Sequence, residues 1–164
     1  MKLHPQKDMH SPGAGETVLF VEDEPRQLTL MQSFLESEGY RVLIANDGAE
    51  AVDIFLRHKQ EIAVVVLDIG LPKLNGWETF LKMKKEAAEL EAIFATGYIT
   101  PELEGAMARG EISGLIMKPY QLDDVLAKIA AALRSPRPPA GDDRASSGEI
   151  LTPAPQSDEG RFPK

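Results

Sequence analysis

The sequence predicts an α/β fold in which a parallel sheet of five strands carries helices on both faces. Segments with the pattern of strands and of amphipathic helices alternate about five times along the chain, which is typical of parallel sheets. The middle strand-like segment, residues 64–67 (VVVL), is apolar throughout rather than at every second position. Such a strand is buried on both faces, as in the centre of a parallel sheet.

Each strand and helix is expected from its own local pattern. The first strand, 17–21, ends in an acidic cluster, and Pro25 suits the first turn of a helix that runs to about residue 38. Asn46, Asp47 and Gly48 form a turn that can cap the second helix. The remaining strands are expected at 41–45, 64–68, 91–96 and 113–117, and the remaining helices at 49–59, 77–86, 101–109 and 121–134.

The helices show which of their sides should face the sheet, because their apolar residues recur at helical spacing. The fourth helix contains Gly105, which costs about 1 kcal/mol relative to Ala in a helix interior, so this helix is expected to be the least stable. The expected inward-facing residues of the other four helices are Leu28, Met31 and Leu35; Ala51, Val52, Phe55 and Leu56; Phe80, Leu81 and Met83; and Leu122, Val125, Leu126, Ile129 and Leu133.

Both ends of the chain are expected to lie outside a single domain at 16–134. Residues 1–15 are polar and broken by prolines and glycines, so they are expected to form a disordered leader. Residues 135–164 are dense in Pro, Gly, Ser and charge and are expected to form a disordered tail. Ile150 and Leu151 leave a second interpretation open, in which the tail is a docking peptide.

Composition restricts the partners and the location. The chain carries a net charge of −8, which repels phosphate backbones, so nucleic acid is not an expected direct partner. No apolar run has membrane-spanning length, and the first residues lack the hydrophobic region of a signal peptide, so no membrane association is expected. The absence of cysteine fits a reducing compartment, and the expected location is the cytoplasm.

Polar side chains follow four of the five expected strands. Glu22 and Asp23 follow the first strand, and Asp68 ends the third. Thr96 ends the fourth, with Gly97 after it, and Lys118 follows the fifth. Ligands of open α/β sheets bind outside the carboxyl ends of the strands, so these groups are placed for chemistry. Asp68 alone, before a turn with Gly and Pro, fits a local loop cap equally well.

The acidic residues among these groups imply a divalent cation. Three clustered carboxylates raise one another's pKa unless positive charge intervenes, and one Lys is not enough. Oxygen ligands without Cys or His favour Mg²⁺, for which Mn²⁺ can substitute. With the metal in place, Asp68 can attack phosphorus and form an aspartyl phosphate. Lys118 and Thr96 would then stabilise charge on the phosphoryl oxygens, and Gly97 would leave room for them.

Four blocks of sequence in this order, VLFVEDEP, VVVLDIGLPKLNGWE, FATGY and MKPY, resemble the receiver domain of two-component response regulators. The resemblance covers roughly 16–134 and implies a flavodoxin-like, doubly wound sheet of order 2-1-3-4-5. It implies that Asp68 is the phosphoacceptor, that Asp23 binds the metal directly and that Glu22 binds it mostly through water. The Gly70 carbonyl would complete the protein's share of the metal ligands.

The same resemblance implies roles at the other strand ends. Thr96 resembles the switch hydroxyl of the family, and Lys118 resembles its phosphate-binding lysine, whose bond to Pro119 is usually cis. The protein would be a phosphoacceptor in a phosphorelay rather than an enzyme, although it would assist its own phosphorylation and slow dephosphorylation. A histidine kinase or phosphotransfer protein would be the donor, and phosphorylation would alter binding to an unknown downstream protein. Leu115 departs from the family, which commonly carries Tyr or Phe there to couple the movement of the threonine to the outer face.

Three other functions fit the sequence less well. A phosphatase of the haloacid dehalogenase type needs a second acid two residues after the nucleophile, where this chain has Gly70. A flavin-binding protein needs a phosphate loop after the first strand, and no such Ser/Thr-rich loop follows it. The main alternative is a receiver-like docking module that is never phosphorylated. A module that never accepts phosphate has no need for clustered acids. Their mutual repulsion without a metal would only cost it free energy.

Overall fold

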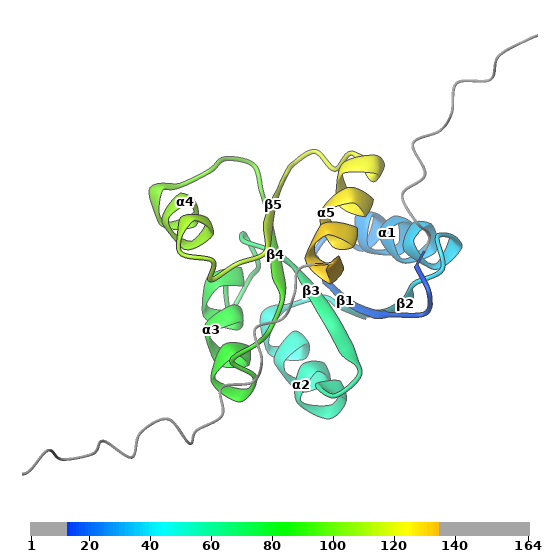
Figure 1. The fold of residues 1–164 in the computed structure, drawn as a ribbon, viewed down its shortest axis with the longest axis horizontal. Coiled ribbons are helices and arrows are strands. Elements are labelled where there is room, and N and C mark those ends of the chain that lie inside the picture. The colour runs from blue at the N-terminus through cyan, green and yellow to red at the C-terminus, as the bar shows by residue number, and fades with distance from the viewer. Residues whose placement is uncertain (1–12, 135–164) are drawn as a thin grey trace, which may run out of the picture.

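The computed structural model describes residues 13–134, which fold around a five-stranded parallel sheet of order β2-β1-β3-β4-β5 (Figure 1). The fold class and the strand order expected from the sequence are therefore confirmed. The strands are β1 (Thr17–Val21), β2 (Arg41–Ala45), β3 (Ile62–Asp68), β4 (Ala92–Thr96) and β5 (Gly114–Met117). The helices are α1 (Pro25–Ser37), α2 (Gly48–His58), α3 (Gly76–Glu86), α4 (Pro101–Ala108) and α5 (Leu122–Arg134).

The helices cover both faces of the sheet and enclose two separate cores (Figure 1). Residues of β1 and β3 alternate between the cores, because successive side chains of a strand point to opposite faces. Phe20 and Val66 face the core covered by α1 and α5. Leu19 and Leu67 face the core covered by α2, α3 and α4. All four side chains are fully buried, as the unbroken apolar pattern of the central strands predicts.

Local sequence explains where the helices begin. Glu24 and Pro25 open α1, and the Glu24 side chain accepts a hydrogen bond from the Arg26 N–H. Asn75 and Glu78 form a reciprocal capping box at the start of α3. The Thr100 hydroxyl caps α4 by accepting a hydrogen bond from the Leu103 N–H at 3.3 Å. These caps fix where each helix starts in the loop that follows the carboxyl end of a strand.

Gly76 allows α3 to begin directly against the end of β3. A Cβ atom at this position would collide with the carbonyl oxygen of Asp68 and lie 2.8 Å from the Cα of Ile69. The obstacle is backbone, which cannot yield as a flexible side chain would. Gly76 is also buried, so the close approach of α3 to Asp68 depends on glycine.

Three leucines expected to face inward are exposed instead, namely Leu56, Leu81 and Leu122. Leu56 and Leu81 each follow a buried phenylalanine, and the next residue of a helix is rotated by about 100° away from its predecessor. Leu122 is the first residue of α5, one turn before the buried Val125 and Leu126. The apolar stripes are therefore narrower than the apolar residues of the sequence suggest.

The described part of the chain begins inside the range expected to be a leader. The Gly13 N–H donates to the Glu38 carbonyl at 2.7 Å, and the Gly15 N–H donates to the Gly39 carbonyl at 3.0 Å. These bonds attach residues 13–15 to the turn between α1 and β2. The expectations for residues 1–12 and for the tail at 135–164 lie outside the described residues. Within 13–134, none of the helices combines the length and apolar character needed to cross a membrane.

Candidate functional site

The carboxyl ends of β1 and β3 bring three carboxylates together. Asp68 ends β3, and Glu22 and Asp23 follow β1 directly, which pairs with β3 up to Val21 and Leu67. One carboxylate oxygen of each residue lies within 4.8 Å of one from each of the others. Glu22 is 1% exposed and Asp68 is 5% exposed, whereas Asp23 is exposed to solvent. The structure therefore unites the three acids predicted from the sequence, with Asp23 on the solvent side.

Asp68 is held in place through both of its carboxylate oxygens. Oδ1 accepts a hydrogen bond from the Gly70 N–H at 2.9 Å, within the turn that leaves β3. Oδ2 accepts one from Lys118 Nζ at 2.6 Å, across the sheet from β5. The local turn explains the first bond, and the second requires the parallel order of the strands. Asp68 thus serves partly as the loop cap that its sequence context suggested, but it also pairs with the Lys118 ammonium.

Glu22 is the most deeply buried acid of the cluster, and three donors contact its carboxylate. Oε1 accepts from the Glu24 N–H at 3.2 Å. Oε2 accepts from the Tyr120 hydroxyl at 2.7 Å and contacts Lys118 Nζ at 3.1 Å. Burial raises the pKa of Glu22 above its usual 4.5, and the Asp68 charge raises it further, against the lowering effect of these three donors. The structure therefore places an acid where its negative charge needs more compensation than the protein gives.

Lys118 joins Asp68 and Glu22 by contacting both carboxylates. Burial opposes its positive charge and lowers its pKa, but the hydrogen bonds and charges of the two acids outweigh burial. The net pKa of Lys118 is raised above 10.5, so the ammonium is charged at neutral pH. One ammonium thus contacts two of the three carboxylates in the cluster.

The donor set fits a Mg²⁺ ion. Three carboxylates within 4.8 Å of one another leave negative charge uncompensated by Lys118, and Mg²⁺ prefers such oxygen ligands. Gly70 lies in the same turn as Asp68, as its N–H bond to Oδ1 shows. The residues present therefore agree with the metal expected from the sequence.

Thr96 ends β4 beside Asp68, but its hydroxyl is bonded within its own loop. The residue is 1% exposed, and β4 pairs with β3 so that Ala95 lies opposite Asp68. The hydroxyl donates to the Tyr98 carbonyl at 2.7 Å and accepts from the Tyr98 N–H at 3.3 Å. A Cβ atom placed on Gly97 would meet nothing within 4 Å, so the space beside Thr96 is open.

The remaining predicted positions lie on β5 and directly after it. The peptide bond between Lys118 and Pro119 is cis, as the resemblance implies. Leu115 is half-buried and packs against the core covered by α2, α3 and α4. The position three residues before Lys118 is therefore filled by an aliphatic side chain.

Tyr120 belongs to the site and was not predicted from the sequence. Its hydroxyl reaches Glu22 from 98 positions away, and no spacing rule predicts such a contact. The available signal was chemical: a tyrosine two residues after Lys118, at a strand end already marked as functional, carries a hydroxyl that needs a partner when it is buried.

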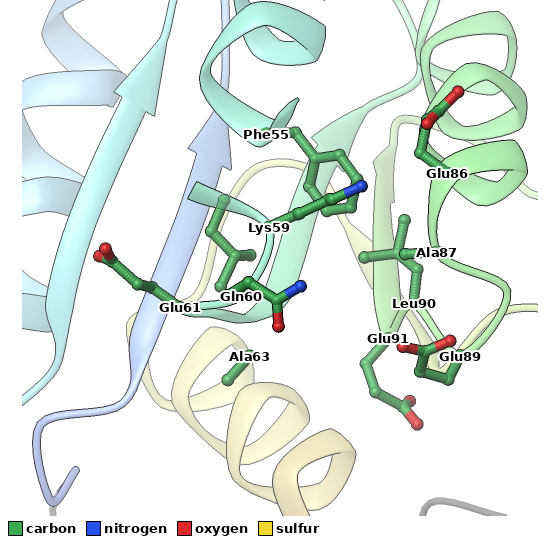
Figure 2. A pocket seen from close by; sticks show the side chains of 11 residues that line it. Phe55, Lys59, Gln60, Glu61, Ala63, Glu86, Ala87, Glu89, Leu90 and Glu91 are labelled. Carbon is green, nitrogen blue, oxygen red and sulfur yellow. The ribbon is translucent and has the colours of Figure 1, made fainter. Parts of the chain in front are cut away.

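A cavity of about 310 Å³ lies at the opposite edge of the sheet (Figure 2). It lies between the last turns of α2 and α3 and the first residues of β3 and β4, and none of the predicted site residues lines it. Two of its carboxylates already have partners, because Glu61 pairs with Arg41 at 3.2 Å and Glu91 accepts a hydrogen bond from the Ser113 hydroxyl. The candidate site is therefore the acidic cluster at the carboxyl ends of the strands and not this cavity.

Sequence comparisons identify a known domain over this region. The family model of the response regulator receiver domain matches residues 18–130. The transcriptional regulatory protein YkoG of Bacillus subtilis is 32% identical over 118 residues, which are 71% of this chain and 50% of YkoG. The chain spans about half the length of the curated relatives it matches.

Solved structures of receivers have the same fold. A CheY-like receiver domain protein from Methanospirillum hungatei is 29% identical, with a TM-score of 0.65 over 73% of this chain and 94% of that one. The response regulator TrrA of Thermotoga maritima, in complex with Mg²⁺ and BeF, is 25% identical, with a TM-score of 0.62 over 72% of this chain and 99% of that one. Because the family model covers more than half of the 164 residues, this chain belongs to the response regulator receiver domain family.

Proposed function

We propose that Asp68 accepts a phosphoryl group from a histidine kinase or a phosphotransfer protein. The observation that carries this proposal is the pairing of a nearly buried carboxylate with a charged lysine at 2.6 Å, inside a cluster of three acids. The family supports the assignment, since receivers are the signalling domains of response regulators. A static docking module would gain nothing from placing these acids together, because their mutual repulsion is unfavourable without a cation.

Glu22, Asp23 and Asp68 would hold Mg²⁺ or Mn²⁺ together with the Gly70 carbonyl. When bound, the ion neutralises charge on the phosphoryl oxygens. Asp23 is exposed and offers a direct ligand, whereas both oxygens of Glu22 already accept hydrogen bonds and suit contact through water. The similar TrrA was solved in complex with Mg²⁺ and BeF, which supports Mg²⁺ as the metal of this chain.

Phosphoryl transfer would require two hydrogen bonds of the present structure to be exchanged. An Asp68 oxygen attacks phosphorus, and the bond from phosphorus to the donor's imidazole nitrogen, or to the acyl oxygen of a small phosphodonor, breaks as that group leaves. Lys118 then gives up part of its contact with Asp68 Oδ2 to stabilise a phosphoryl oxygen. The Thr96 hydroxyl releases the Tyr98 carbonyl to donate to another phosphoryl oxygen.

The output we propose is a change in affinity for a downstream protein. Exchange of the Thr96 hydrogen bond alters the loop before α4, where Tyr98 is 72% exposed. Several of the curated relatives are named transcriptional regulatory proteins, so we propose that the signal ends in gene regulation. DNA would then be bound at a later step of the pathway. The chain's own charge of −8 still disfavours direct contact with a phosphate backbone.

Intact-mass measurement after incubation with acetyl phosphate and Mg²⁺ tests the assignment. The wild type should gain one phosphoryl group, and Asp68→Asn should gain none, because an amide cannot form the acyl phosphate. Asp53→Asn is the matched control, since Asp53 is exposed on α2 and is not a member of the acidic cluster. Omission of Mg²⁺ in the presence of EDTA should also prevent labelling.

Two results would contradict the proposal. Equal labelling of wild type and Asp68→Asn would place the phosphoryl group elsewhere. A wild type that stays unmodified with acetyl phosphate and with phosphorylated kinase partners would favour the docking module instead.

A further inference from the structure

Tyr120 links the segment after β5 to the acidic cluster through a single hydroxyl group. Its O–H donates to Glu22 Oε2 at 2.7 Å. The half-buried ring packs against the core covered by α1 and α5, edge-on to Phe20 of β1 with 5.8 Å between the ring centroids. Because β1 leads directly into Glu22, the packing that fixes the ring also fixes the direction from which the hydroxyl meets the carboxylate.

The hydrogen bonds of Glu22 leave little freedom for its carboxylate. Oε1 accepts from the Glu24 N–H, while Oε2 accepts from Tyr120 and contacts Lys118. A carboxylate has about four acceptor sites, so about one remains for a metal ion or a water molecule bound to it. The orientation of Glu22 decides whether that site points into the cluster with Asp23 and Asp68.

Lys118 cannot maintain this orientation by itself. Its Nζ lies closer to Asp68 Oδ2, at 2.6 Å, than to Glu22 Oε2, at 3.1 Å. It is also the group expected to turn toward the phosphoryl oxygens during transfer. Tyr120 is different, because Glu22 is the single hydrogen-bond acceptor of its hydroxyl among residues 13–134. The hydroxyl can therefore stay on Glu22 when Lys118 shifts.

We propose that Tyr120 is a positioning residue: its hydroxyl holds the Glu22 carboxylate in the orientation that binds Mg²⁺. This inference rests on the proposed function and adds to it a residue that does not touch the metal. Hydrogen bonds to a metal ligand orient it, and their removal typically weakens metal binding by about 10- to 100-fold. Tyr120 acts on the metal through Glu22 alone.

Titration of Mg²⁺ into the full chain by calorimetry tests the inference with Tyr120→Phe. This variant removes one oxygen atom and keeps the ring that packs on Phe20 and lies 5.4 Å from Lys118 Nζ. The dissociation constant should rise about tenfold, at the lower end of the usual range because Glu24 and Lys118 still bind Glu22. Tyr40→Phe is the matched control, since Tyr40 is buried just before β2, at the opposite edge of the sheet, and should leave the affinity unchanged.

A kinetic measurement separates positioning from a folding defect. The Mg²⁺ concentration that gives half-maximal labelling by acetyl phosphate should also rise about tenfold in Tyr120→Phe. A merely structural defect would instead lower the thermal stability of the metal-free variant and its maximal rate of labelling. Equal Mg²⁺ affinity of wild type and Tyr120→Phe, or equal weakening by Tyr40→Phe, would overturn the inference and leave the proposed function intact. A wild type that binds no Mg²⁺ would overturn both.

Discussion

Asp47 shows at the scale of one residue how a side chain can join two segments near the site. Its Oδ1 accepts from the Glu50 N–H at 2.8 Å and caps α2, while Oδ2 accepts from Lys73 Nζ at 3.2 Å. Lys73 has a left-handed backbone, with φ of 64°, in the loop between Asp68 and α3. The Glu50 N–H, followed by Lys73, lowers the pKa of Asp47 below its usual 3.8.

Two substitutions of Asp47 should distinguish how much its helix cap and its ion pair with Lys73 each contribute to stability. Asp47→Ala should lower the free energy of unfolding by about 1 kcal/mol at neutral pH, because it leaves a helix N–H without its partner. Asp47→Asn should lose less, since the amide oxygen still caps α2. A carboxyl with a depressed pKa stabilises the fold fully above its unfolded pKa and loses that contribution as the pH falls through its lower folded pKa. The deficit of Asp47→Asn should therefore begin to shrink as the pH falls below 3.8 and vanish only below the depressed folded pKa of Asp47. Urea unfolding at several pH values measures the free energy of unfolding of both variants. Equal losses of stability for Asp47→Ala and Asp47→Asn would show that the ion pair with Lys73 contributes more than the cap.

Individual residues also show where prediction from sequence ends. Asp68, Thr96 and Lys118 were predicted because each stands at the end of an apolar run, and parallel order alone brings such ends together. The partner of the Thr96 hydroxyl, the Tyr98 backbone, depends on the path of one loop. The contact between Tyr120 and Glu22 depends on the packing of a ring against β1, and neither determinant is visible in residue spacing.

At the scale of the element, α4 has the weakest attachment to the sheet. It has eight residues and buries Leu103 and Ala106, whereas α5 buries five side chains. A cavity of about 210 Å³ lies beside its first turn, lined by Trp77 and Ile69 among others. Gly105 weakens the helix further. Few buried contacts and a neighbouring void are typical of a segment that opens locally, so α4 remains the helix we expect to be least stable.

Binding of beryllofluoride, a mimic of the phosphoryl group, should change amide hydrogen exchange most in α4. The drive is chiefly the new hydrogen bond of Thr96, worth about 1.5 to 3 kcal/mol, whereas a swing from 1:99 to 99:1 needs about 5.5 kcal/mol. Leu115 also supplies no aromatic ring to fill the space that Thr96 leaves. We therefore expect a partial shift, seen as an intermediate change of exchange across 101–108.

Thr96→Ala is the control for this experiment. It should remove most of the response in α4 while phosphorylation itself continues, because Asp68 and the metal ligands remain. Unchanged exchange in α4 alongside clear changes in other helices would reject α4 as the responding element.

For the whole molecule, the sequence pattern predicted the fold because strands and helices differ in the period of their apolar residues, and both kinds of element contribute to each core. Strands buried on both faces read as continuous apolar runs, and helices that cover one face read as stripes. The close packing of α3 on β3 was not predictable in this way. It depends on Gly76, because any side chain there would collide with the backbone at the end of β3. Nothing in the sequence indicates that the two backbones meet at this glycine.

Deletion of residues 135–164 should leave this architecture and its chemistry intact. Both faces of the sheet are already covered by the five helices of residues 13–134, and the last of them, α5, ends at Arg134. The deleted segment has few large apolar residues, Ile150, Leu151 and Phe162, and little to bury. The free energy of unfolding of the truncated chain should therefore stay within about 1 kcal/mol of full length, with unchanged labelling by acetyl phosphate.

A tail that packs on the domain would give the opposite result. A double substitution, Ile150→Ser with Leu151→Ser, tests for such packing within the full chain. If the tail packs on the domain through these two side chains, deletion and double substitution should destabilise the protein equally and by several kcal/mol, the usual cost of removing buried aliphatic side chains. If the tail is a peptide for another protein, both variants should unfold like the wild type. A stability loss on deletion that the double substitution does not reproduce would place the contact elsewhere in the tail. Thermal unfolding of the three proteins side by side distinguishes these outcomes, and we expect three coincident curves.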